Sequence, residues 1–214
     1  MLLSVFQTFY ENLADSSWLE AIAVLTGLLS VWFAKKENIL VYPTGIVNVL
    51  IYVYICFHVK LYADMGINAF YFVMSVYGWV KWTRKDVKQH VRPIARASRK
   101  ENILSVVGVV IFFFIIYYLL KNFTDSTVPY WDAFTTALFI IGMWMMALKK
   151  IENWVYWIIG DLLVIPLFAY KGLVLTSVQY FIFLALAVSG YIEWRRKLLH
   201  QPPPYPTPPG RGLS

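Results

Sequence analysis

The sequence predicts an all-α membrane protein with seven transmembrane helices. Of its 214 residues, 59% are apolar and only 14% are charged, whereas roughly a quarter of the residues in a soluble domain are charged. Apolar runs long enough to cross a hydrocarbon core of roughly 30 Å as a helix recur along the chain. Because these runs follow one another so closely, they leave little room for a soluble domain.

The seven helices follow from hydropathy. They are expected at residues 18–34, 38–57, 61–82, 103–120, 131–148, 153–170 and 173–194. The connections within the first three and within the last three helices are only a few residues long, as in Lys35-Lys36-Glu37 and Lys171-Gly172. Such short connections place neighbouring helices antiparallel. The sequence therefore predicts two three-helix units, residues 18–82 and 131–194.

Four further segments lie outside these units. Residues 1–17 are interpreted as an extracytoplasmic lead-in, because no basic region precedes their apolar residues and no small-residue cleavage site follows. Residues 83–102 form a polar, basic loop. The uncharged helix 103–120 links the units and is expected to pack against lipid or a neighbouring subunit. Residues 195–214 are a basic tail, whose proline-rich part cannot form helix or sheet.

The basic residues predict the topology. When loops are assigned alternately to two sides, every one of the 19 Lys and Arg residues except Lys60, Lys121 and Lys171 falls on the same side. The positive-inside rule makes that side cytoplasmic. The N-terminus then lies outside and the C-terminus inside, which requires an odd number of spans. The net charge of +7 is thus placed at helix ends, and we expect no nucleic-acid partner.

The two units are copies of one repeat, offset by about 113 residues. The matches include Gly78 and Trp82 with Gly190 and Trp194, and the helix-start signals Glu37-Asn38 with Glu152-Asn153. Because an odd helix separates the copies, both enter the membrane in the same direction, and such parallel repeats hold substrate between them near the midplane. The alternative is a repeat that only builds a stable bundle. Trp82 and Trp194, beside Lys81 and Arg195, are interpreted as interfacial belt or packing residues.

Four polar side chains inside the spans are the candidate lining of a cavity. Unsatisfied polar groups are costly in hydrocarbon and therefore tend to line cavities. They are Asn48, Asn68, Asp161 and Gln179. Asn48 and Asp161 lie at about equivalent places in the two copies, as do Asn68 and Gln179, which favours a central polar ring. The alternative is hydrogen bonding from helix to helix.

Aromatic side chains share helix faces with these polar residues. The three sets are Trp154 with Trp157 and Asp161, Asn48 with Tyr52, and Asn68 with Phe72, Ser75 and Trp79. Aromatic rings stack on flat rings and attract cations, a carboxylate favours a cation, and amides bind hydroxyl groups. The pattern suits a flat, partly cationic heterocycle that bears a hydroxylated sugar.

The sequence gives no support for catalysis or a metal site. It has no HExxH, GxSxG or Walker A motif, so we assign no catalytic residue, and direct ATP-driven pumping by this chain is excluded. The three histidines, His58, His90 and His200, lie at loops or helix ends and cannot converge on a metal. The single Cys56 cannot form a disulfide framework alone. We expect neither a metal nor a cofactor.

Taken together, the motifs GIVNV, LYAD, YGWVKW and ENWVYW resemble those of the PnuC family of bacterial nicotinamide riboside transporters. The resemblance covers residues 18–197. It implies a SWEET-like fold, a homotrimer in the bacterial cytoplasmic (inner) membrane, and facilitated diffusion of nicotinamide riboside. A cytosolic kinase would then trap the riboside by phosphorylating it.

Carried over to this chain, the resemblance implies a substrate site. Its residues would be Asn48, Asn68, Trp154, Trp157, Asp161 and Gln179, to which the shared helix faces add Tyr52, Phe72 and Trp79. Family members often have Gln where Asn68 stands and Asn where Asp161 stands. These departures leave thiamine or riboflavin as alternative substrates. A proton-coupled importer, in which Asp161 titrates, and a non-transporting membrane assembly or sensor are further alternatives.

Overall fold

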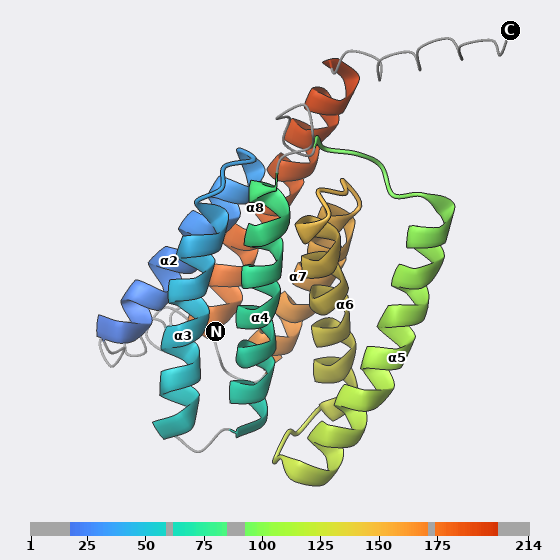
Figure 1. Cartoon of the computed structure of the whole chain (residues 1–214). Coiled ribbons are helices and arrows are strands. Elements are labelled where there is room, and N and C mark those ends of the chain that lie inside the picture. Colours follow the sequence, from blue (N-terminus) through green and yellow to red (C-terminus); the bar gives the residue numbers. More distant parts are fainter. Residues whose placement is uncertain (1–17, 59–61, 85–92, 171–173, 201–214) are drawn as a thin grey trace, which may run out of the picture.

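The computed structural model describes residues 18–58, 62–84, 93–170 and 174–200, and these ranges contain seven helices (Figure 1). The helices are α2 (Trp18–Lys35), α3 (Val41–His58), α4 (Tyr62–Thr83), α5 (Arg99–Phe123), α6 (Pro129–Ala147), α7 (Asn153–Tyr170) and α8 (Val174–His200). Helices α2, α3 and α4 form one antiparallel unit, and α6, α7 and α8 form the other. Helix α5 packs mainly against α6. The predicted all-α fold is confirmed.

Five of the seven helices, α2, α3, α5, α7 and α8, are long and apolar enough to cross a membrane. The outward face of helix α5 carries exposed apolar side chains, such as Leu104, Ile111 and Phe114. Such a face is compatible with contact with lipid. Helix α6 begins with the polar sequence Pro-Tyr-Trp-Asp and is buried over most of its length. Most of its apolar side chains therefore pack against neighbouring helices and not against lipid.

Helix α5 begins earlier than hydropathy predicts. The expected loop 83–102 ends instead at Ser98, where a capping box starts the helix. The Ser98 Oγ accepts the Glu101 backbone N–H at 3.2 Å, and the Glu101 carboxylate accepts the Ser98 backbone N–H at 2.7 Å. Hydropathy ends a span where charges begin, whereas a capped helix continues through charged residues. The helix predicted at 103–120 is therefore longer at both ends.

Helix α8 also continues beyond its predicted end at Trp194. Residues 195–200, which were assigned to the tail, remain helical, because charged side chains that reach water do not interrupt a helix. The lead-in 1–17 and the proline-rich residues 201–214 lie outside the described residues.

One end of the bundle collects the basic residues. Figure 1 shows that the α2–α3 and α6–α7 turns, the last turns of α4 and α8 and the first turn of α5 all lie there. We call this the basic end, and we call the end that carries the α5–α6 loop the opposite end. Helices α2 and α6 both run towards the basic end, so the two units are parallel copies.

The units meet along two seams, α2 against α8 and α4 against α6. Within each unit, the ring contacts at the basic end repeat after 112 residues. Tyr42 meets Trp82 edge to face with ring centroids 5.2 Å apart, and Trp154 meets Trp194 in the same way at 5.6 Å. The Tyr42 ring lies against Gly78, and the Trp154 ring against Gly190. The sequence match of Gly78 and Trp82 with Gly190 and Trp194 therefore marks equivalent packing positions.

Helices α2 and α6 end in the same Schellman-type turn. Glu37 and Lys149 adopt left-handed backbone conformations, with φ of 58° and 52°. The Glu37 N–H donates to the Ala34 carbonyl at 3.0 Å, and the Lys149 N–H donates to the Met146 carbonyl at 2.9 Å. Glu37 thus corresponds to Lys149. The sequence match of Glu37 with Glu152 is wrong because the turn conformation, not the acidic residue, is what repeats.

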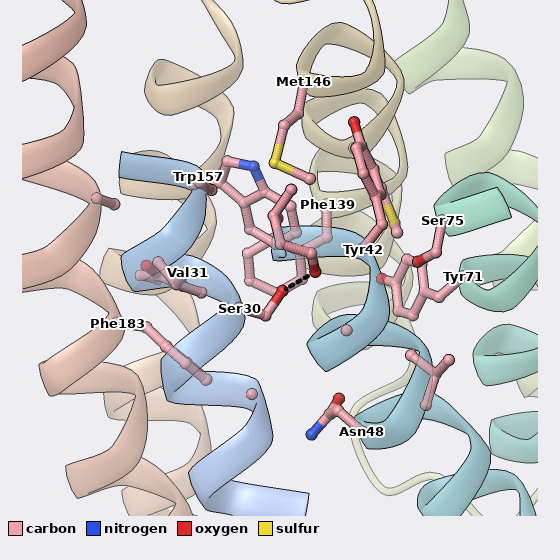
Figure 2. Close-up of a pocket in the computed structure, with 18 of the residues that line it drawn as sticks. Ser30, Val31, Tyr42, Asn48, Tyr71, Ser75, Phe139, Met146, Trp157 and Phe183 are labelled. Atoms are coloured by element: carbon pink, nitrogen blue, oxygen red, sulfur yellow. Dashed lines mark hydrogen bonds between the residues drawn. The ribbon is translucent and has the colours of Figure 1, made fainter. Parts of the chain in front are cut away.

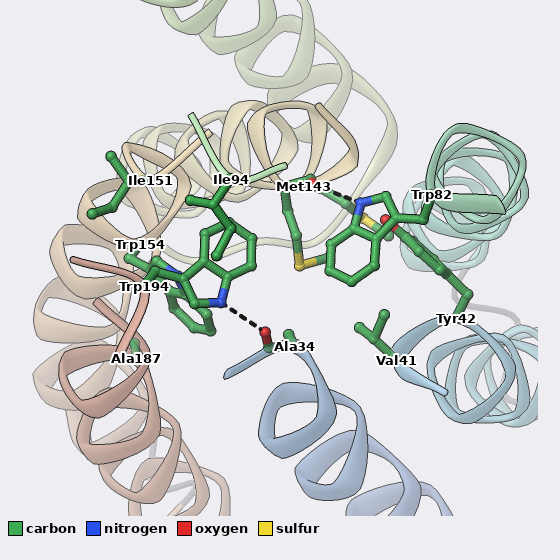
Figure 3. Close-up of a cluster of buried hydrophobic side chains, with 11 residues drawn as sticks. Ala34, Val41, Tyr42, Trp82, Ile94, Met143, Ile151, Trp154, Ala187 and Trp194 are labelled. Atoms are coloured by element: carbon green, nitrogen blue, oxygen red, sulfur yellow. Dashed lines mark hydrogen bonds between the residues drawn. The ribbon is translucent and has the colours of Figure 1, made fainter. Parts of the chain in front are cut away.

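The largest buried cluster closes the basic end between the units (Figure 3). Its buried members, which we call the basic-end cluster, are Ala34, Val41, Tyr42, Trp82, Ile94, Met143, Met146, Ile151, Trp154, Ala187 and Trp194. Trp82 and Trp194 are only 4% and 0% exposed. The belt interpretation of these two tryptophans is therefore wrong, and the packing interpretation is correct.

We expect Gly190→Ala to destabilise the protein. A Cβ at this position would lie within 2.8 Å of three atoms of the rigid Trp154 ring, so the ring must move, and overpacking of this kind costs about 1–3 kcal/mol. Thermal melts of the detergent-solubilised protein will measure the loss. The matched control is Gly66→Ala on α4, where a Cβ meets nothing within 4 Å. Equal melting temperatures for both variants would contradict this packing.

Candidate functional site

A central cavity of about 190 Å³ lies between the two units (Figure 2). All six helices of the units contribute side chains to it, whereas α5 contributes none. Polar groups are few and come from both units, with Ser30, Asn48 and Ser75 in the first and Asp161 in the second. Most of the lining is aromatic or aliphatic, as is usual for small-molecule sites.

A second cavity of about 750 Å³ extends from this region to the α5–α6 loop. It is lined by more polar side chains, including Asp125, Ser126 and Asp132 near that loop. We call it the opposite-end cavity. The two cavities adjoin, because they share the lining residues Asn48, Val49, Tyr71, Phe139, Tyr180 and Phe183.

The nine candidate residues from the sequence fall into three groups. Asn48, Trp154, Trp157 and Asp161 line the central cavity. Tyr52, Asn68 and Gln179 line the opposite-end cavity, and Asn48 lines both. Phe72 and Trp79 line neither cavity. The four polar residues therefore do not form one ring but are distributed over two adjoining cavities, with Asn48 at the junction.

Helix rotation explains the displacement of Phe72 and Trp79. The inward face of α4 carries Tyr71, which lines both cavities, and Gly78, which meets the Tyr42 ring. Phe72 and Trp79 each follow one of these residues, so they are rotated by about 100° from that face. Trp79 is accordingly 39% exposed.

Asp161 is the ionisable side chain of the central cavity. It is 2% exposed, and no residue in the described ranges gives its carboxylate a hydrogen bond or an ion pair. No Lys, Arg or His lines either cavity. An unpaired carboxylate in a buried, apolar setting is costly, and an ionisable residue inside a membrane span usually marks a functional site.

Three aromatic rings stack beside this carboxylate's helix. Phe139 stacks on Trp157 with centroids 5.2 Å apart and an interplanar angle of 23°, and it stacks on Tyr180 at 6.0 Å and 18°. Gly160 makes this possible, because a Cβ there would overlap the Phe139 ring. Of these three rings, only Trp157 was predicted from the sequence as a site residue. The glycine at 160, one residue before Asp161, is the signal that a large side chain packs against α7 there.

Asn48 has a structural partner as well as a place in the cavity. Its Nδ2 donates to the Ala23 backbone carbonyl on α2 at 2.6 Å, and Gly27 provides the space for the amide group. The alternative of helix-to-helix hydrogen bonding is therefore realised by one end of this side chain.

The repeat makes the site asymmetric. With the observed offset of 112 residues, Asn48 corresponds to Gly160, and Gly27 corresponds to Phe139. The first unit thus supplies an amide where the second supplies a phenyl ring, and Asp161 lies one residue beyond the position equivalent to Asn48. The polar pairs are equivalent only to within one residue. An asymmetric ligand with one hydrogen-bonding part and one flat part fits this arrangement.

No group of three or more His, Cys, Asp or Glu side chains in the described residues could hold a metal ion. What the cavities offer is binding chemistry, namely a carboxylate, stacked aromatic rings and an amide.

Comparisons with known proteins agree on one family. The family described as nicotinamide mononucleotide transporter matches residues 17–196. The nicotinamide riboside transporter PnuC of Escherichia coli (strain K12) is 27% identical over 205 residues, which cover 84% of this chain and 86% of that protein. The riboflavin/roseoflavin transporter RibM of Streptomyces davaonensis is 26% identical, covering 83% of this chain and 84% of that protein.

A solved structure gives the same relationship. The crystal structure of the vitamin B3 transporter PnuC matches this chain with a TM-score of 0.70 and 26% identity. The match covers 92% of this chain and 89% of that one. The similarity therefore includes both three-helix units and the helix between them.

Proposed function

The chain belongs to the nicotinamide mononucleotide transporter family, and on that premise we propose that it imports nicotinamide riboside by facilitated diffusion. As a member of a transporter family it is not an enzyme, and it is a multi-pass membrane protein. The substrate has a flat pyridinium ring with a positive charge and a ribose with hydroxyl groups. These two parts correspond to the two kinds of group in the cavities.

The single observation that supports this substrate best is the unpaired, buried carboxylate of Asp161. A cation bound beside it would gain a strong interaction, because the charge is held in surroundings of low polarity. The adjacent Trp157 and Phe139 rings offer a stacking surface, and aromatic faces also attract cations. A neutral ligand would leave the carboxylate unpaired. A flat cation satisfies both groups together.

The ribose is proposed to lie towards the opposite-end cavity. Asn48 stands at the junction of the cavities, and Asn68 and Gln179 lie beyond it. Amides both donate to and accept from hydroxyl groups. Asp125 lies further along the same cavity, and a carboxylate at a cleft attracts cations.

We place the basic end in the cytoplasm, following the positive-inside rule. The N-terminus would then be outside and the C-terminus inside the bacterial cytoplasmic membrane. The exposed apolar face of α5 would contact lipid and the neighbouring subunits of a homotrimer. Net uptake would be driven by a cytosolic kinase that phosphorylates the riboside, since facilitated diffusion alone cannot concentrate a solute.

Calorimetry on the purified protein tests the substrate directly. We expect nicotinamide riboside to bind and thiamine and riboflavin to bind at least about tenfold more weakly, a difference of about 1.4 kcal/mol. Counterflow of labelled riboside in liposomes then tests transport. Binding without counterflow would favour a sensor or assembly subunit, and binding of none of the three compounds would contradict the proposal.

Riboflavin is the second candidate, because the riboflavin/roseoflavin transporter RibM is 26% identical to this chain over 184 residues. Preferential binding of riboflavin in the same calorimetry would select it.

Proton coupling is a further candidate mechanism, since a buried carboxylate such as Asp161 can carry a proton. Uptake that depends on a pH gradient would support coupling. Full transport by Asp161→Asn, together with no effect of the gradient, would exclude it.

A further inference from the structure

The two ends of the central cavity have different surroundings. Towards the opposite end it adjoins the large cavity that reaches the α5–α6 loop. Towards the basic end it meets the basic-end cluster, several of whose members also form the cavity wall, including Tyr42, Met146 and Trp154. For a solute to leave at the basic end, the side chains of the basic-end cluster must therefore move apart.

Each seam between the two units is fastened at the basic end by one indole hydrogen bond (Figure 3). The Trp82 Nε1–H on α4 donates to the Met146 carbonyl on α6 at 3.1 Å. The Trp194 Nε1–H on α8 donates to the Ala34 carbonyl on α2 at 3.0 Å. Residues 82 and 34 are each 112 positions before residues 194 and 146, so the two bonds are equivalent and reciprocal. Each unit thus donates one indole hydrogen bond to the other.

The two acceptor carbonyls belong to the turns that end α2 and α6. The Ala34 oxygen also accepts the Glu37 N–H, and the Met146 oxygen also accepts the Lys149 N–H. A carbonyl oxygen has two lone pairs and can accept both donors. Each indole is thereby attached to the turn that carries Glu37 or Lys149 in the other unit.

The side chains of those turns join the units a second time. Lys149 Nζ contacts Glu37 Oε1 at 2.8 Å, and it lies 4.6 Å from the centroid of the Trp82 ring. Lys197 Nζ contacts Glu37 Oε2 at 3.2 Å. Glu37 of the first unit is therefore paired with two lysines of the second, directly beside the indole bonds.

Ile94 completes the closure from a third direction. It is 1% exposed and packs in the basic-end cluster (Figure 3). Its neighbour Ala95 donates to the Lys149 carbonyl and accepts from the Ile151 N–H, both at 3.0 Å. The segment before α5 is thus fixed to the α6–α7 turn of the second unit and moves with that unit.

We propose that Trp82 and Trp194 are paired latches of a gate at the basic end, and that the central cavity opens to that side only when both indole hydrogen bonds break. Because the bonds are equivalent, the units separate along both seams together. The Glu37–Lys149 pair strengthens the closed state. The substrate's identity plays no part in this inference.

The test measures access to the central cavity by thiol labelling. Ser75→Cys in a Cys56→Ser background places the reporter, since Ser75 is 2% exposed and lines the cavity. A membrane-impermeant methanethiosulfonate reagent is applied to either face of oriented vesicles. Lys100→Cys, at the exposed first turn of α5, identifies the basic-end side independently of the proposed topology.

Trp82→Phe with Trp194→Phe removes both N–H donors and keeps aromatic rings. The loss of these two hydrogen bonds should raise labelling from the basic-end side by about tenfold or more. Glu37→Gln, which retains the shape of the side chain, should raise it by about threefold. The matched control is Trp32→Phe on α2, a tryptophan that is 44% exposed and outside the cluster, and it should leave labelling unchanged.

The proposal is overturned if neither the double variant nor Glu37→Gln increases labelling from the basic-end side while both elute as folded protein. It is equally overturned if Trp32→Phe increases labelling as much as the double variant, or if the reporter alone reacts as fast from the basic-end side as from the other. A failure of nicotinamide riboside to bind would contradict the proposed substrate and would leave these outcomes unaffected.

Discussion

Replacing Asp161 with asparagine is expected to weaken nicotinamide riboside binding about 100-fold, or about 2.7 kcal/mol. The substitution keeps the size of the side chain and removes its charge. In the central cavity this charge has no partner among the described residues, so the bound cation would be its counterion. Removing one member of such a buried charge pair typically costs 2–5 kcal/mol. Calorimetry on the wild-type and variant proteins measures the difference.

A neutral ligand provides the control. The dihydronicotinamide form of the riboside has nearly the same shape but lacks the ring charge, so Asp161→Asn should change its affinity by less than about threefold. An equal loss for both ligands would mean that Asp161 shapes the cavity without pairing with the ring. Unchanged binding of the charged riboside would remove the carboxylate from the site altogether.

Trp157→Ala is expected to weaken binding about 30-fold. Stacking of a flat heterocycle on an aromatic side chain contributes about 1–3 kcal/mol, and the charge of the pyridinium adds a cation–π contribution. Trp157→Phe retains a ring and should lose only a few-fold in affinity. Asn48→Ala should weaken binding less than Trp157→Ala, because one end of the amide already bonds the Ala23 carbonyl.

The matched control for this series is Trp131→Ala. Trp131 is 48% exposed on α6 and lines neither cavity, so the same loss of an indole should leave the affinity unchanged. Size-exclusion profiles of all variants establish that assembly is intact. Wild-type affinity in Trp157→Ala would place the substrate elsewhere in the protein.

The fold could be predicted from the sequence because helices that contact lipid must be apolar over their whole length. A membrane-spanning helix needs a continuous apolar run, and the short connections force antiparallel neighbours. Helix ends were predicted less well. Ser98 and Glu101 start α5 by hydrogen bonding, and residues 195–200 continue α8 through charges. Hydropathy averaged over a window detects neither the capping hydrogen bonds nor the helical continuation through charged residues.

The site was predicted only in part because side-chain direction depends on how each helix is rotated against its neighbours. Helical spacing shows which residues share a face, but it does not show which face points inward. Trp157 and Asp161 line the central cavity, whereas Trp79 faces outward and Phe139 was overlooked. An offset of 112 in place of 113 also shifts every equivalence by one residue, which is about 100° around a helix.

The Glu37–Lys149 pair also shows why the two units cannot be identical. Two identical three-helix chains related by a two-fold axis would form the reciprocal Trp82 and Trp194 bonds without difficulty, because an isologous interface contacts itself in this way. The same symmetry would place two glutamates or two lysines opposite each other at the equivalent positions 37 and 149. A pair of opposite charges at these two equivalent positions therefore requires halves that differ in sequence, as the two units of this single chain do.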